Sequence, residues 1–183
     1  MPRPHRVHVP HGLYHVTARG NRRQVIFIEE ADYFRFFKLL DRVIDDLSWR
    51  CHAYCLMPNH YHLVVETPGA DLSTGMHRLN SAYSNWFNRR YELNGHLFQS
   101  RFYAVSVETD SHLLELSRYL ALNPVRGGLC TRPGEWTWSS YRFVAHLTPE
   151  PRLLALERVL SYFGREPRLA RDAFRAFVRD GYR

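Results

Sequence analysis

Two histidines separated by one residue, His60 and His62, open an apolar stretch of the chain. Successive side chains of a β-strand point to opposite faces, so both histidines would lie on one face and Tyr61 on the other. Neutral imidazole is the commonest metal ligand among side chains, and two on one strand could hold a divalent ion with the rest of its shell open. The alternative is a chance pair among the eleven histidines of the chain.

A tyrosine and an asparagine later in the chain could complete such a site. Tyr119 and Asn123 are four residues apart in a helical pattern, so they would share one face of a helix. A phenol can act as a nucleophile, and an amide oxygen can complete the shell of a hard cation. Alternatively, Tyr119 is an ordinary aromatic residue at a packing interface, and Asn123 is an ordinary helix terminator. Tyr83 is a rival nucleophile, although Phe87 stands four positions after it.

The hydrophobic pattern predicts the elements that would position these residues. Strands are expected over 13–18, 50–57, 60–67 and 102–107, and helices over 30–47 and 71–91. The order β-α-β-β-α-β is that of a ferredoxin-like α+β sandwich. A further helix over 111–123 would carry Tyr119 and should stop near Asn123, because the residue before Pro124 disfavours helix.

The C-terminal part of the chain reads as a short helical extension. A linker-like composition over 148–151 separates a predicted domain of residues 1–147 from an extension of residues 148–183, which has two short helices split at Gly164. In the last helix, Ala170, Ala173, Phe174, Phe177 and Val178 should dock on the body of the protein. The opposite stripe is either solvated or contacts structured DNA; its members are Arg168, Arg171, Arg175 and Arg179.

The charge balance favours a nucleic-acid partner. The formal net charge is +7, and Lys38 is the only lysine among 25 basic residues. The planar fork of arginine suits phosphate better than the ammonium of lysine does. The remaining candidates for contacts with a nucleic-acid backbone lie in the first loop and around the second helix; they are Arg19, Arg22, Arg23, Arg89, Arg90 and Arg101.

The chain carries neither a recognisable signal peptide nor an apolar run of membrane-spanning length, so we expect a cytoplasmic protein without a membrane partner. Its three cysteines are expected to be reduced. Two of them permit a further hypothesis, a zinc site built from Cys51, Cys55, His60 and His62, in which both cysteines would share one strand face.

Four motifs together resemble the single-tyrosine HUH nucleases of insertion sequences, and within them the REP-associated tyrosine transposases, which act at repetitive extragenic palindromes (REP). They follow the family's order over about residues 12–145. The motifs are Met-Pro-Asn-His-Tyr-His at 57–62, Gly-His-Leu-Phe-Gln-Ser-Arg-Phe at 95–102, Tyr-Leu-Ala-Leu-Asn-Pro-Val-Arg at 119–126 and Trp-Thr-Trp-Ser-Ser-Tyr at 136–141. In this chain Tyr61 stands where the family usually has a plain hydrophobic residue.

The resemblance implies a ferredoxin-like fold with an antiparallel sheet and a helix that carries the nucleophile. It also implies that His60, His62 and Asn123 hold Mg²⁺ or Mn²⁺, that Tyr119 is the nucleophile, and that no small-molecule cofactor is needed. The implied reaction nicks and rejoins single-stranded DNA at palindromic hairpins through a 5′-phosphotyrosine. We expect a monomer, with a dimer as the alternative.

Two alternatives from other classes remain open. One is a DNA-binding regulator that keeps the fold without catalysis, and the other is a metal-dependent phosphodiesterase that uses water. The His60, His62, Tyr119 and Asn123 set argues against the regulator.

Overall fold

The four predicted strands form one antiparallel sheet in the computed structural model, which describes residues 9–148 and 151–182. They are β1 (Gly12–Arg19), β2 (Arg50–Met57), β3 (His60–Thr67) and β4 (Tyr103–Ser106). The strand order is β2-β3-β1-β4, with every neighbouring pair antiparallel. This is the ferredoxin-like arrangement, so the predicted fold class is confirmed, and it puts β3 and β1 side by side at the centre.

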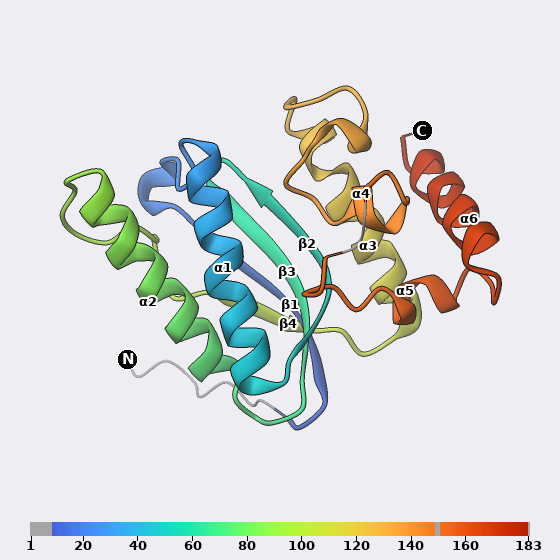
Figure 1. Cartoon of the computed structure of the whole chain (residues 1–183), viewed down its shortest axis with the longest axis horizontal. Helices are drawn as coiled ribbons and strands as arrows, with labels where there is room; N and C mark the ends of the chain where they lie inside the picture. The colour runs from blue at the N-terminus through green and yellow to red at the C-terminus, as the bar shows by residue number, and fades with distance from the viewer. Residues whose placement is uncertain (1–8, 149–150, 183) are drawn as a thin grey trace.

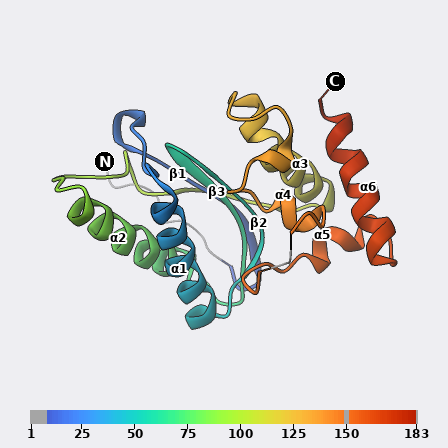
Figure 2. The same cartoon turned by 45° about the horizontal axis from the view of Figure 1, so that its top comes forward.

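Helices cover the sheet from both sides (Figures 1 and 2). On one side lie α1 (Glu30–Leu47) and α2 (Leu72–Arg90), and on the other lies α3 (Asp110–Arg126), which packs against β2. Most of the remaining elements follow α3, and all but α6 are short; they are η1 (Asn21–Arg23), η2 (Pro133–Glu135), α4 (Tyr141–Val144), α5 (Glu157–Ser161) and α6 (Pro167–Asp180). Within the two described ranges, no helix has the length and apolar character needed to cross a membrane.

Tyr61 shows how strand alternation divides β3 between the two faces. Its ring is fully buried against Phe36 of α1, with 4.8 Å between the ring centroids. Its hydroxyl donates a hydrogen bond of 2.6 Å to Asn80 Oδ1 on α2. A buried tyrosine hydroxyl needs such a partner. Tyr61 therefore belongs to the α1/α2 face, as alternation predicted, and the histidines on either side of it face α3.

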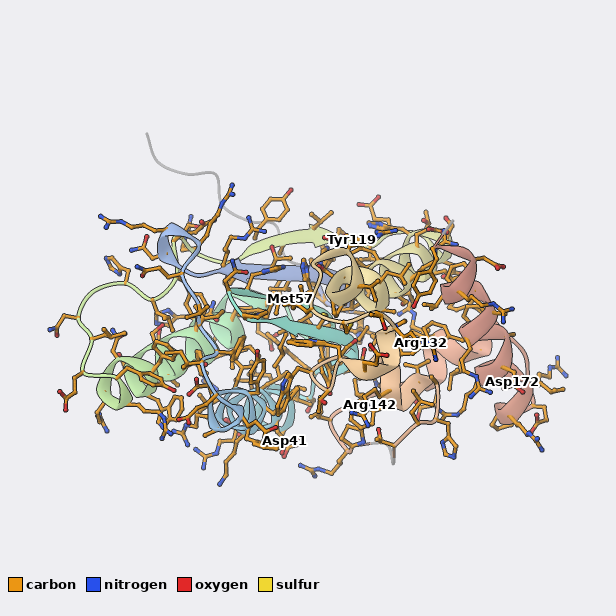
Figure 3. The ribbon with its side chains drawn as sticks, turned by 90° about the horizontal axis from the view of Figure 1, so that it is seen from above. Asp41, Met57, Tyr119, Arg132, Arg142 and Asp172 are labelled. Carbon is orange, nitrogen blue, oxygen red and sulfur yellow. The ribbon has the colours of Figure 1, made fainter. Side chains whose placement is uncertain are left out.

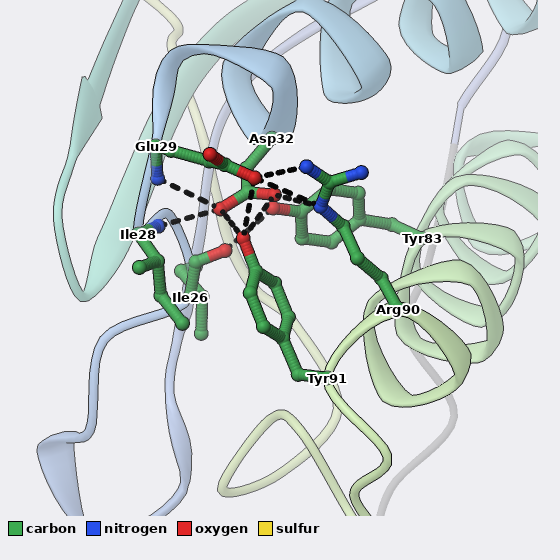
Figure 4. A network of polar contacts seen from close by, with 7 residues as sticks. All are labelled: Ile26, Ile28, Glu29, Asp32, Tyr83, Arg90 and Tyr91. Carbon is green, nitrogen blue, oxygen red and sulfur yellow. Dashed lines mark hydrogen bonds and ion pairs between the residues drawn. The ribbon is translucent and has the colours of Figure 1, made fainter.

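A polar network ties the segment before α1 to the end of α2 (Figure 4). The fully buried Asp32 carboxylate accepts hydrogen bonds from Ile28 N (2.6 Å), Glu29 N (3.0 Å) and the Tyr91 hydroxyl (2.9 Å). Arg90 forms an ion pair with Glu29. Since a buried carboxylate is tolerated only when it is hydrogen-bonded, the network fixes the path of the chain between β1 and α1, where η1 carries two of the predicted DNA contacts.

Helix α3 runs to Arg126, so the predicted end near Asn123 is wrong. Pro124 lacks an N–H and costs only one helical hydrogen bond in the last turn. The carbonyls there are satisfied, because Gly127 N donates to Asn123 O (2.8 Å) and Leu129 N donates to Pro124 O (2.9 Å). Asn123 thus lies within the helix, with its side chain buried towards the sheet.

The C-terminal extension packs on α3 through α5 and α6. Gly164, with φ of 142°, separates these two helices as predicted. His52 of β2 also binds the extension, since its Nδ1 lies 3.0 Å from Ala155 O, and its Nε2 lies 2.9 Å from Glu66 of β3. The domain boundary at residue 147 stays a prediction, and Pro149 and Glu150 of the proposed linker lie outside the described residues.

The arginine stripe of α6 divides into two kinds of side chain. Arg171 donates to the carbonyls of Phe143 and Val144, and Arg175 donates to that of Ala145. These two arginines bind the protein itself, although Arg175 is exposed like Arg168 and Arg179. The apolar face docks as predicted through Ala170, Phe174 and Val178, except that Ala173 is exposed.

Candidate active site

The two histidines of β3 lie on the sheet face that α3 covers. His62 pairs across the sheet with Thr17 of β1 and with Cys55 of β2. Directly paired side chains share a face, and alternation puts His60 on the same face. The two imidazole rings are perpendicular, with 5.0 Å between their centroids.

Helix α3 brings the other two predicted residues to this pair. Asn123 Nδ2 lies 2.9 Å from His62 Nε2. The Tyr119 ring meets the His62 ring edge to face, with 5.6 Å between the centroids. Figure 3 labels Tyr119 on α3, where this helix lies beside the sheet. The structure therefore gathers His60, His62, Tyr119 and Asn123 from two elements that are far apart in the sequence.

Tyr119 is accessible to a substrate. Its side chain is 39% exposed, and its hydroxyl has no hydrogen-bond partner among the described residues. The Arg126 guanidinium lies 6.0 Å from the centroid of its ring. The rival Tyr83 is fully buried and donates its hydroxyl to Ile26 O, and burial raises its pKa. Of these two tyrosines, only Tyr119 has an accessible side chain next to His62.

Two further residues contact the histidines and were not found from the sequence. His15 Nε2 on β1 lies 3.0 Å from His62 Nδ1, and the two rings are stacked. Asn59 Oδ1, in the turn between β2 and β3, lies 2.7 Å from His60 Nδ1. A signal for His15 existed, because it falls on the first predicted strand, which neighbours the histidine strand in the ferredoxin-like order.

Burial keeps all three histidines neutral. Desolvation lowers the pKa of His62 to about 3, with contributions from His15, His60 and Arg19. Desolvation and Arg19 lower the pKa of His60 to about 4, and desolvation and His112 lower the pKa of His15 to about 4. A neutral imidazole has one nitrogen lone pair for a metal ion, so the rings are in the form that can act as ligands at neutral pH.

The donor set fits a divalent cation, with His60, His62 and Asn123 as the residues that could hold it. Within the described parts of the chain, no group of three or more His, Cys, Asp or Glu side chains could hold a metal. A metal here would therefore depend on two imidazoles and an amide oxygen, with its other positions filled from outside the protein. Imidazole ligands suit Mn²⁺ better than Mg²⁺.

The zinc hypothesis is wrong. A β-bulge between Cys51 and Ala53 shifts the register of β2, so that Cys51 pairs with Val65 whereas Cys55 pairs with His62. Val65 and His62 lie on opposite faces of β3. The two cysteines therefore face opposite sides of the sheet, and they cannot join both histidines around one ion.

A cavity of about 260 Å³ lies beside the histidines. Arg19 and Arg101 line it together with Tyr103 of β4, which is 65% exposed. Of the other predicted contacts, Arg22, Arg23 and Arg89 are exposed away from this cavity, and Arg90 is held in its ion pair with Glu29. The site thus combines two arginine side chains, two imidazoles and the accessible phenol of Tyr119.

Comparison with known proteins decides the family. Residues 8–123 match the family model described as "Transposase IS200 like". The chain belongs to the IS200-like transposase family. Transposases process DNA, so this membership implies a DNA-processing enzyme, and the resemblance stated from the sequence motifs is confirmed.

Two known proteins resemble the chain over most of its length. The chain is 25% identical over 143 residues to a protein of Haemophilus influenzae named as a REP-associated tyrosine transposase, a match that covers 71% of this chain and 80% of the relative. It also resembles, with a TM-score of 0.68 and 20% identity, the solved structure of a REP-associated tyrosine transposase bound to a REP hairpin. That match covers 85% of this chain and 92% of the other and supports the fold.

Proposed function

We propose that this transposase is a metal-dependent endonuclease and strand transferase that nicks and rejoins single-stranded DNA at palindromic hairpins. The observation that carries the proposal is the position of Tyr119, whose exposed ring contacts His62, while Asn123 on the same helix face contacts His62 Nε2. A nucleophile and the ligand set for a cation thus come from two elements that pack together.

In the proposed reaction, the Tyr119 oxygen attacks a backbone phosphorus. The new bond joins phosphorus to the phenolic oxygen, and the bond to the 3′ oxygen breaks. The phenolic proton leaves to water, the 3′ oxygen takes up a proton, and the 5′ phosphate stays on Tyr119. Attack by the free 3′-hydroxyl reverses the step and joins the strands. The positive charge of Arg126 near the ring stabilises the negative charge that develops on the phenol.

His60, His62 and Asn123 would hold Mn²⁺ or Mg²⁺. When bound, the ion supplies Lewis acidity at a non-bridging phosphate oxygen. The residues around it position the substrate, because Arg19 and Arg101 line the adjoining cavity and can pair with the DNA backbone. The exposed ring of Tyr103 offers a surface on which an unpaired base can stack.

A hairpin substrate is supported by the solved relative, which is bound to a REP hairpin. Outside the cavity, five exposed arginines can contact the backbone of such a hairpin; they are Arg22, Arg23, Arg89, Arg168 and Arg179. We assign no DNA contact to Arg90, Arg171 or Arg175, because each is bonded within the protein. The expected monomer stays a prediction that light scattering can check.

The test uses labelled single-stranded hairpin oligonucleotides with Mn²⁺ or Mg²⁺ and detects a DNA adduct that survives denaturation. Tyr119→Phe should lose the adduct and keep hairpin binding, whereas Tyr182→Phe, at another exposed tyrosine, should keep both. Cleavage without an adduct would indicate the water-using phosphodiesterase. Binding without cleavage would indicate the regulator.

A further inference from the structure

We propose that His15 and Asn59 are positioning residues that hold His62 and His60 in one tautomer, with hydrogen on Nδ1 and the lone pair on Nε2. Both histidines would then present Nε2 to a metal ion. The proposal deepens the proposed function and rests on it, because that function makes His60 and His62 the ligands.

The contacts of His62 determine its tautomer. Its Nε2 lies 2.9 Å from the amide nitrogen of Asn123. An amide nitrogen only donates, so Nε2 of His62 must accept and its hydrogen must be on Nδ1. That hydrogen points to His15 Nε2, 3.0 Å away. His15 therefore accepts through Nε2 and carries its own hydrogen on Nδ1.

The contacts of His60 lead to the same tautomer through a different residue. Asn59 Nδ2 donates to the carbonyl of Arg23, at 3.1 Å. This bond orients the amide, so its oxygen faces His60 Nδ1 at 2.7 Å. Because a carbonyl oxygen only accepts, the hydrogen of His60 is also on Nδ1. The turn itself is held by a hydrogen bond of 2.8 Å from Gly20 N to Asn59 O.

Two independent contacts thus prepare the two rings in the same way. Histidine ligands of metal ions usually donate their second N–H to a fixed partner, which sets the tautomer and the ring orientation. Here an imidazole from β1 serves one ring, and an amide from the β2–β3 turn serves the other. Neither ring needs to move its hydrogen before Nε2 can act as a ligand; only the Asn123 amide, whose nitrogen donates to His62 Nε2, must turn its oxygen towards the ion.

The first test needs no metal. Long-range ¹H–¹⁵N correlation spectra of the ¹⁵N-labelled full chain report which ring nitrogen carries hydrogen, and His60→Gln and His62→Gln assign the signals. We expect the Nδ1–H form for both rings in the wild type. Because Asn123 Nδ2 also selects the Nδ1–H form of His62, we expect a mixture of tautomers at His62 when His15→Phe is combined with Asn123→Leu, which removes that donor. Asn59→Leu should give a mixture at His60. Nε2–H rings in the wild type would overturn the proposal.

The second test measures Mn²⁺ affinity by the electron paramagnetic resonance signal of free Mn²⁺. Loss of such a partner typically weakens metal binding by about 10–100-fold, and we expect this for His15→Phe and Asn59→Leu. His15→Gln and Asn59→Asp keep an acceptor and should restore most of the affinity. His52→Phe removes another buried, hydrogen-bonded histidine from β2, outside the site, and should leave the affinity unchanged.

The two tests separate the possible failures. Wild-type affinity in folded His15→Phe and Asn59→Leu would overturn the positioning role. A wild type that binds no Mn²⁺ would instead contradict the proposed metal site, and the metal-free spectra would still decide which tautomer His15 and Asn59 impose.

Discussion

Replacing Asp32 with alanine tests whether the polar network of Figure 4 holds the segment before α1. The carboxylate is fully buried and accepts hydrogen bonds from Ile28 N, Glu29 N and the Tyr91 hydroxyl. A hydrogen bond to a charged group contributes about 1.5–3 kcal/mol. The freed donors of Ile28 and Tyr91 can reach water and recover part of this. We therefore expect the free energy of unfolding to fall by about 3 kcal/mol.

Urea denaturation at neutral pH, followed by circular dichroism, measures this loss. Asp41→Ala is the matched control on the same helix, because its carboxylate is exposed and should change stability by less than about 0.5 kcal/mol. Tyr91→Phe removes one hydrogen bond of the network and should cost about 1 kcal/mol. A loss below about 1 kcal/mol for Asp32→Ala would show that this carboxylate does not anchor the segment.

Three further predictions concern pH, DNA and the C-terminal extension. The folded-state pKa values of His60 and His62 are lowered to about 4 and about 3, so the unfolded chain binds protons first as pH drops below about 6.5. The free energy of unfolding without metal should therefore fall between about pH 6.5 and 4, by up to about 1.4 kcal/mol per pH unit for each histidine. A free energy of unfolding that urea denaturation shows to be the same across this pH range would contradict this. Arg101→Ala should weaken hairpin binding measured by fluorescence anisotropy. It should also reduce the slope of log binding constant against log salt concentration by about 0.7–0.9, whereas Arg90→Ala should leave this slope unchanged. Arg171→Ala should lower the free energy of unfolding by about 1–2 kcal/mol, since its hydrogen bonds to two carbonyls tie α6 to the rest of the protein. An unchanged thermal denaturation curve would contradict that role.

The sequence was most informative where the repeat of a strand or a helix decides which face a side chain occupies. Alternation put His60 and His62 on one face and Tyr61 on the other, and the Pro58-Asn59 turn gave β2 and β3 their observed bounds. The spacing of Tyr119 and Asn123 placed both on one helix face. These features depend on local geometry, which the chain carries in its residue types.

The parts that could not be predicted depend on how elements meet. His15 reaches His62 only through the register of β1 against β3, which local patterns do not reveal. The separation of Cys51 from Cys55 depends on a β-bulge, and one extra residue there turns a side chain to the other face. Arg171 looked like a surface cation, but its partners are backbone carbonyls, which any residues could supply.

Mass spectrometry of the covalent adduct between the protein and a hairpin oligonucleotide tests most directly whether Tyr119 is the nucleophile. Trypsin releases Tyr119 in the peptide Tyr-Leu-Ala-Leu-Asn-Pro-Val-Arg, residues 119–126, which has no second tyrosine. We predict that this peptide carries a nucleotide joined through its 5′ phosphate to the phenolic oxygen. An adduct on a peptide that contains Tyr83 or Tyr103, or cleaved DNA with no modified peptide, would contradict it.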